Sequence, residues 1–145
     1  MDGTPVTAHV IDKNEQQSRN KRMQAVCTSC HSTDWVVEHF HRLDNTIART
    51  NAITHEATKI MTDIWDGGYA RGLPQGDNIF DEESERIWTS IWLFYANSTR
   101  FTSAMAGGGD YGVFADGRFQ TTEQVYRLHE YLKRHRQLNA KAPKQ

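Results

Sequence analysis

The chain contains few of the residues that crosslink or stiffen a protein. Of its 145 residues only three are proline and two are cysteine. Two cysteines cannot build the dense disulfide framework of a small secreted domain. Apolar residues make up 37% of the sequence, which is low for a self-sufficient globular domain. The composition excludes a disulfide-dense miniprotein, while the length suits one domain with a core.

An excess of charge of one sign and long apolar runs are also missing. The sequence has 17 Lys+Arg against 18 Asp+Glu, so it has no surplus of basic residues of the kind that nucleic-acid binding uses. Its longest nearly apolar stretch, residues 91–96, is far shorter than the roughly 20 residues of a transmembrane helix. The first residues carry no secretory signal pattern. We therefore expect neither nucleic-acid binding nor a membrane span.

Apolar residues recur at the three- and four-residue spacing of helices, and no segment alternates with the period of a strand. The fold class predicted is all-α, with long helices. The pattern predicts four helices. They cover residues 15–29, a long segment that ends at residue 66, residues 81–105, and residues from 121 onward. Side-chain oxygens at residues 32–34 can cap the start of the long second helix. Glycines at 112 and 117 predict a loop before the last helix. The expected organisation is an extended segment 1–14, a helical domain 15–137 and a frayed tail 138–145.

Acidic residues cluster at the start of the third predicted helix, from Asp81 to Glu85. The positive end of a helix dipole favours acids at this position. We interpret the cluster as a solvated helix start and not as an acid–base pair.

The motif with the clearest chemistry is Cys27-Thr28-Ser29-Cys30-His31, a C-x-x-C-H sequence that contains both cysteines of the chain. Two thiols three residues apart can form thioethers to the two vinyl groups of one porphyrin. The next residue, His31, then lies under the iron as the proximal ligand. The motif predicts covalent haem c, held by Cys27, Cys30 and His31.

Three other interpretations of the motif stay open. A zinc site needs two further ligands at a suitable spacing, which His129 and His135 do not provide. A thioredoxin-like pair needs a strand before it, and none is predicted. The motif can also occur by chance, in a haem-free helical interaction module.

The sequence leaves the second axial ligand open. His39 and His55, both on the long second helix, are the candidates for binding a haem iron. Met61 and Met105 carry thioethers, but a methionine on a helical stripe usually packs in a core. Met105 is the candidate sixth ligand if the chain is a free-standing monohaem cytochrome c, the alternative function.

Several segments resemble hydroxylamine oxidoreductase-like octahaem cytochromes c. The run from Arg19 to Ser32 is similar to the approach to the last haem motif of that family. Residues 91–95 and 100–105 resemble its C-terminal helix, and Asp110-Tyr111 resembles the Asp-Tyr that follows it. The resemblance covers about residues 15–135 and a C-terminal quarter of such a protein.

The resemblance implies a periplasmic, or equivalent extracytoplasmic, multihaem oxidoreductase that acts on small nitrogen compounds through mostly bis-His haems. In hydroxylamine-oxidising members, the tyrosine that Tyr111 matches is covalently linked to the catalytic haem of a neighbouring subunit in a trimer. The implied partners are another haem-bearing segment or subunit, a redox partner protein and two further copies in a homotrimer.

A single haem motif and the missing export signal predict that the chain is a fragment, a truncated frame or one part of a split protein. We expect the isolated chain to transfer electrons without turnover, because it has no second haem with an open site.

Overall fold

The computed structural model describes residues 10–72, 75–104 and 111–141, and these residues form helices and connecting turns without a strand. The chain divides into two compact units, Met1–Arg42 and Leu43–Gln145. We call them the N-terminal unit and the C-terminal unit. The all-α prediction is confirmed.

The N-terminal unit contains helix α1, Lys13–Cys27. Asp12 caps it, because its carboxylate accepts a hydrogen bond from the Glu15 backbone N–H at 2.8 Å. Glu15 also pairs with Arg19 one turn later. No residue of α1 is buried, so the helix makes no core of its own.

Helix α2, Thr33–Asp66, follows within five residues and continues into the C-terminal unit. Its start agrees with the predicted capping segment, since Ser32 Oγ accepts from the Trp35 backbone N–H at 3.3 Å. At its other end Gly68 adopts a φ of 68°, the left-handed conformation that glycine tolerates best. The sequence therefore predicted both ends of this long helix.

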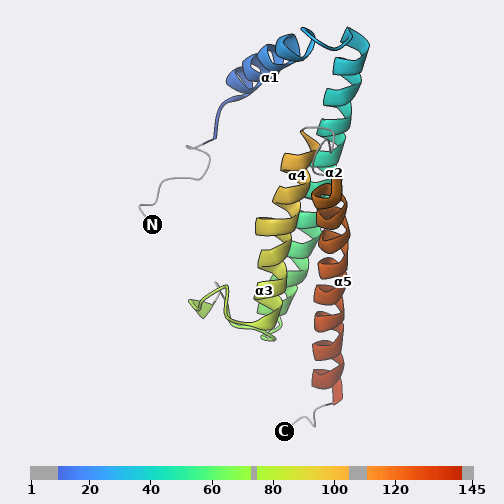
Figure 1. The fold of residues 1–145 in the computed structure, drawn as a ribbon. Coiled ribbons are helices and arrows are strands. Elements are labelled where there is room, and N and C mark those ends of the chain that lie inside the picture. Colours follow the sequence, from blue (N-terminus) through green and yellow to red (C-terminus); the bar gives the residue numbers. More distant parts are fainter. Residues whose placement is uncertain (1–9, 73–74, 105–110, 142–145) are drawn as a thin grey trace. The chain divides into compact units, whose positions relative to one another are not determined.

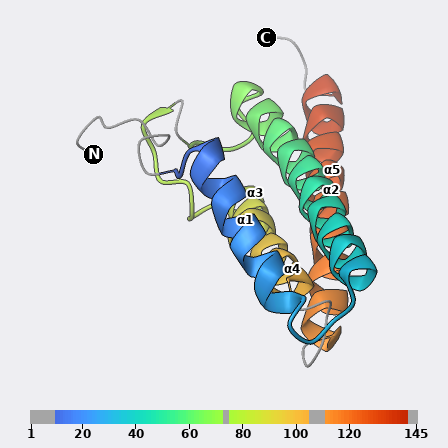
Figure 2. The same cartoon turned by 90° about the horizontal axis from the view of Figure 1, so that it is seen from above.

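In the C-terminal unit, α2 is joined by a helical stretch that runs back along it and by a last helix that returns (Figure 1). The stretch consists of α3 (Glu83–Thr89), the π-helix η3 (Ser90–Tyr95) and α4 (Ala96–Ser103). Helix α5, Tyr111–Lys141, lies against all three of them. Figure 2 shows α2 and α5 side by side in a second view.

The core of this bundle consists of buried side chains from each of its helices except α4. The cluster contains Ala57, Ile60, Met61, Ile64, Trp65, Ala70, Ile87, Ile91, Leu128, Tyr131 and Leu132. Polar contacts also fix α2 against its neighbours; for example, Trp88 Nε1 donates to Thr58 Oγ1 at 3.1 Å, and Arg136 pairs with Asp63 at 2.9 Å.

The loop predicted across residues 112–120 is wrong, because α5 already begins at Tyr111. The prediction treats glycine as a helix breaker, but Gly117 is buried where α5 crosses the preceding helices. A Cβ at this position would lie 2.8 Å from Thr99 Oγ1 and 3.1 Å from the Tyr95 carbonyl oxygen. Gly117 therefore allows close helix packing and does not end the helix.

The expected single helix over 81–105 is interrupted by η3, which the sequence pattern does not predict. The helix also starts differently from the expected solvated cluster, because Ser84 and Glu85 have no exposed surface. Met105 and Asp110 lie outside the described residues. Residues 138–141, expected in the tail, continue α5.

Candidate haem c site

Both cysteines lie on one turn of chain between α1 and α2. Cys27 is the last residue of α1, and its carbonyl oxygen accepts from the backbone N–H groups of Cys30 (3.2 Å) and His31 (3.0 Å). Both thiols are free, with Cys27 half-buried and Cys30 exposed. The turn therefore gathers two accessible sulfurs and the following imidazole within one pentapeptide.

The two hydroxyl residues between the cysteines are engaged with the backbone of α1. Thr28 Oγ1 donates to the Ala25 carbonyl at 2.9 Å, and Ser29 Oγ donates to the Val26 carbonyl at 2.7 Å. Such bonds give partners to carbonyl groups near the end of the helix, where the intrahelical ladder stops. They hold the x-x positions to the helix, so the spacing of the two sulfurs is set by helical geometry.

The imidazole of His31 stacks on the indole of Trp35, with ring centroids 3.9 Å apart and an interplanar angle of 15°. Stacking occupies a ring face, whereas a histidine binds iron through the lone pair at the ring edge. Within the described residues neither nitrogen of His31 has a hydrogen bond. The ring is thus held in orientation while its edge stays available to iron.

The two candidate axial ligands have different surroundings. His39 is 6% exposed; its ring stacks on Trp35 at 5.1 Å and meets the edge of Phe40 at 5.4 Å. His55 is exposed and belongs to the C-terminal unit. Met61 has no exposed surface and packs in the bundle core, so it is a core residue.

Sequence reasoning missed the role of Trp35. From the sequence alone, each tryptophan can be a core residue or can pack around a porphyrin, and these two interpretations cannot be separated. Residues 31, 35 and 39 are spaced four apart, and this spacing brings side chains together on one side of a helix. The repeated four-residue spacing of His, Trp and His was the available signal.

The Tyr111 side chain is 70% exposed and touches Phe114, at the beginning of α5. The structure thus leaves its predicted role untested.

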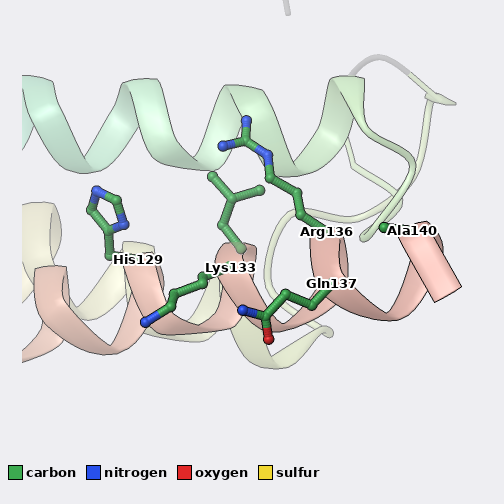
Figure 3. Close-up of a pocket in the computed structure, with 6 residues that line it drawn as sticks. His129, Lys133, Arg136, Gln137 and Ala140 are labelled. Atoms are coloured by element: carbon green, nitrogen blue, oxygen red, sulfur yellow. The ribbon is translucent and has the colours of Figure 1, made fainter.

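Among the surface grooves lined by described residues of the C-terminal unit are two whose lining includes no cysteine. The first, of about 370 Å³, lies along α5 and is basic (Figure 3). It is lined by His129, Leu132, Lys133, Arg136, Gln137 and Ala140. The second, of about 460 Å³, is lined by Glu83, Arg86, Ile87, Ser90, Tyr95, Gln124 and Arg127.

Clustered metal ligands and membrane-spanning helices are both missing from the described part of the chain. It contains no group of three or more His, Cys, Asp or Glu side chains that could hold a metal ion. In the same residues no helix has the length and apolar character needed to cross a membrane.

Comparison with known proteins identifies the class to which this site belongs. Residues 1–77 match the family model described as "Seven times multi-haem cytochrome CxxCH". The chain belongs to the multihaem cytochrome c family. It is therefore a haem c protein, and its domain is of the electron-transferring kind.

A solved structure supports the assignment to this multihaem family. A chain named "Hypothetical multiheme protein" is 31% identical to this cytochrome, with a TM-score of 0.79. The match covers 96% of this cytochrome. This cytochrome spans 26% of that chain. No curated protein matches the sequence.

The donor set of the cytochrome fits haem c. Thioether attachment needs two free thiols, and both cysteines are free. The proximal position needs an imidazole with an unblocked ring edge, and His31 offers one beside Cys30.

Proposed function

We propose that this cytochrome is the electron-transfer segment of a hydroxylamine oxidoreductase-like multihaem oxidoreductase. Cys27 and Cys30 tether its haem c, and His31 is the proximal iron ligand. The observation that carries the proposal is the single turn from Cys27 to His31, with its two free thiols and open-edged imidazole. The low share of the similar multihaem chain that it spans supports a place within a larger haem assembly.

When bound, haem c supplies an iron that takes up and releases single electrons. The residues of this chain determine where that iron lies and how its ligand is oriented. The helical turn fixes the sulfur spacing, and the stack on Trp35 limits rotation of the His31 ring. A ligand held in this way needs little rearrangement when the charge on the metal changes.

The nitrogen chemistry of the proposal rests on the resemblance of residues 19–32, 91–105 and 110–111 to the octahaem family. In that assembly the other haems, the redox partner and a homotrimer are supplied by further segments and subunits. An extracytoplasmic compartment is the expected location, because multihaem c-type cytochromes are generally matured there.

Mass spectrometry of the chain matured in a host with c-type haem machinery tests the attachment. We expect a gain of one haem mass in the wild type and in the control Ser29→Ala, and none in the double variant Cys27→Ala/Cys30→Ala. A pyridine haemochrome spectrum of c type accompanies the gain. The bare polypeptide mass for the wild type contradicts the proposal.

Tyr111 is proposed as the subunit-linking position of the trimer, and its 70% exposure is compatible with contact to a neighbouring subunit. In the assembled oxidoreductase we expect Tyr111→Phe to abolish subunit association that resists denaturing detergent. Tyr126→Phe is the matched control, since Tyr126 is also 70% exposed on α5. If the wild-type subunits separate fully in detergent, the linking role is wrong.

A further inference from the structure

The groove of about 460 Å³ lies between two walls of the C-terminal unit. Residues of α3 and η3 form one wall and residues of α5 form the other, and α5 contacts both of these segments. Ile87 and Gln124, which are 8% and 9% exposed, make its floor. The volume falls within the range of about 300–1,000 Å³ that is usual for small-ligand sites. The groove therefore has the size and the rigid walls that a small ligand needs.

Two guanidinium groups without an anionic partner line this groove, one from each wall. Arg86 comes from α3 and Arg127 from α5, and within the described residues neither forms an ion pair. Arg127 Nη1 donates instead to the neutral side-chain oxygen of Gln124 at 3.1 Å. By contrast, Arg136 on the same helix pairs with Asp63 at 2.9 Å. Since Glu83 is the single acidic residue of the lining, positive charge exceeds negative charge in the groove.

The π-helix η3 brings a further hydrogen-bonding residue to the same wall. Glu83, Arg86, Ile87 and Ser90 follow the three- and four-residue spacing of one helix face. Tyr95 comes five residues after Ser90, and in an α-helix two such residues point about 140° apart. The i→i+5 bonding of a π-helix turns the chain less per residue, so Tyr95 returns to the groove. Single π-helical turns within α-helices are frequent at functional sites.

We propose that this groove binds a ligand with two carboxylate groups, one held by Arg86 and one by Arg127, with the Tyr95 hydroxyl as an additional hydrogen-bond donor. A guanidinium binds a carboxylate through two parallel hydrogen bonds, so two unpaired guanidinium groups suit two carboxylates. The carboxylates come from a free dicarboxylic acid or from the two propionates of a haem on another segment. The site goes beyond the proposed function, because a free dicarboxylic acid can occupy it without a neighbouring haem.

The test is a titration of the haem-attached 145-residue chain with succinate, followed by nuclear magnetic resonance of the arginine side-chain N–H groups. We expect saturable shifts for Arg86 and Arg127, and binding of acetate that is at least about tenfold weaker. Arg86→Gln and Arg127→Gln should each weaken succinate binding by at least about tenfold. Arg118→Gln is the matched control, because Arg118 is exposed on α5 outside the groove, and it should leave the affinity unchanged.

Two conservative substitutions separate a shaped site from general attraction by charge. Arg86→Lys keeps the positive charge but loses the planar pair of donors, so we expect it to bind succinate more weakly than the wild type. Tyr95→Phe should also weaken binding, and an unchanged affinity removes the role of Tyr95. Equal affinities for succinate and acetate, shifts that do not saturate, or the same loss in Arg118→Gln as in Arg127→Gln would overturn the proposal. A missing haem mass in the sample is a separate result, which contradicts the proposed function alone.

A competition experiment identifies the source of the two carboxylates. The competitors are metal-free mesoporphyrin, which has two propionates and no iron for a histidine to bind, and its dimethyl ester. If mesoporphyrin displaces succinate and the ester does not, the groove holds the propionates of a haem from another segment. If mesoporphyrin does not displace succinate, the ligand is a free dicarboxylic acid. Both results support the groove as a site for two carboxylates.

Discussion

At the scale of single residues, Glu85 has a buried carboxyl group that two hydrogen bonds hold in the C-terminal unit. Its side chain has no exposed surface. One oxygen accepts from Trp65 Nε1 at 2.9 Å, and the other accepts from the Glu82 backbone N–H at 3.3 Å. Gly72 makes room for this contact, since a Cβ there would lie 2.7 Å from Glu85 Oε1. Burial raises the pKa of Glu85 above its ordinary value of 4.5, although the two hydrogen bonds oppose the shift.

This raised pKa predicts a pH dependence of stability. The folded chain holds the Glu85 proton more tightly than the unfolded chain, so its contribution is complete below pH 4.5 and is lost as pH rises through the raised pKa. We expect the free energy of unfolding of Glu85→Gln to fall less between about pH 4 and neutrality than that of the wild type.

Denaturant titrations at a series of pH values measure this difference. Glu83→Gln is the control, because Glu83 is exposed two positions earlier on the same helix. Parallel stability profiles for wild type and Glu85→Gln contradict the assignment.

Sequence reasoning at the residue scale predicts haem ligands within one short motif, but it does not predict the buried acid. The C-x-x-C-H chemistry lies within one helical turn, so no tertiary information is needed to bring its sulfurs together. The burial of Glu85 depends on Trp65, twenty positions away, and on the turn at Gly72. A run of acidic residues at the start of a helix has the same sequence whether or not another part of the chain packs over one of its faces.

At the scale of elements, two glycines of α5 have opposite functions. A Cβ added at Gly112 would have nothing within 4 Å, whereas one added at Gly117 would lie against Thr99 and Tyr95. From the sequence pattern alone, both glycines predict a loop. This is why the start of α5 was predicted wrongly, while both ends of α2, marked by local capping groups, were predicted correctly.

The pair supplies a matched test of close packing. Gly117→Ala forces Thr99 or the backbone of η3 to move, which costs about 1–3 kcal/mol and exceeds the gain in helix propensity of about 1 kcal/mol. We expect a net loss of up to about 2 kcal/mol in unfolding free energy. Gly112→Ala leaves stability unchanged or raises it by up to about 1 kcal/mol. Equal effects of the two substitutions would rule out the packing role of Gly117.

At the scale of the whole molecule, the two units differ in how they are stabilised. The C-terminal unit has a core built from α2, α3, η3 and α5. Helix α1 of the N-terminal unit has no buried residue, and Met23 and Val26, which precede Cys27, are 56% and 67% exposed. Helix α1, next to the haem motif, therefore contributes no buried apolar side chain.

This contrast predicts that haem attachment stabilises one unit selectively. A lone helix the length of α1 is marginally stable in water, whereas a thioether-bound porphyrin beside Met23 and Val26 supplies apolar surface for it to pack against. In Cys27→Ala/Cys30→Ala we expect the amides of α1 to exchange with solvent at nearly unfolded rates, while those around Leu128 and Leu132 in α5 stay protected. Haem attachment should slow exchange in α1 and leave α5 unchanged, as followed by hydrogen–deuterium exchange with Ser29→Ala as the control. Loss of protection in α1 and α5 together would mean that the chain unfolds as one cooperative body, and that haem stabilises the C-terminal unit as well.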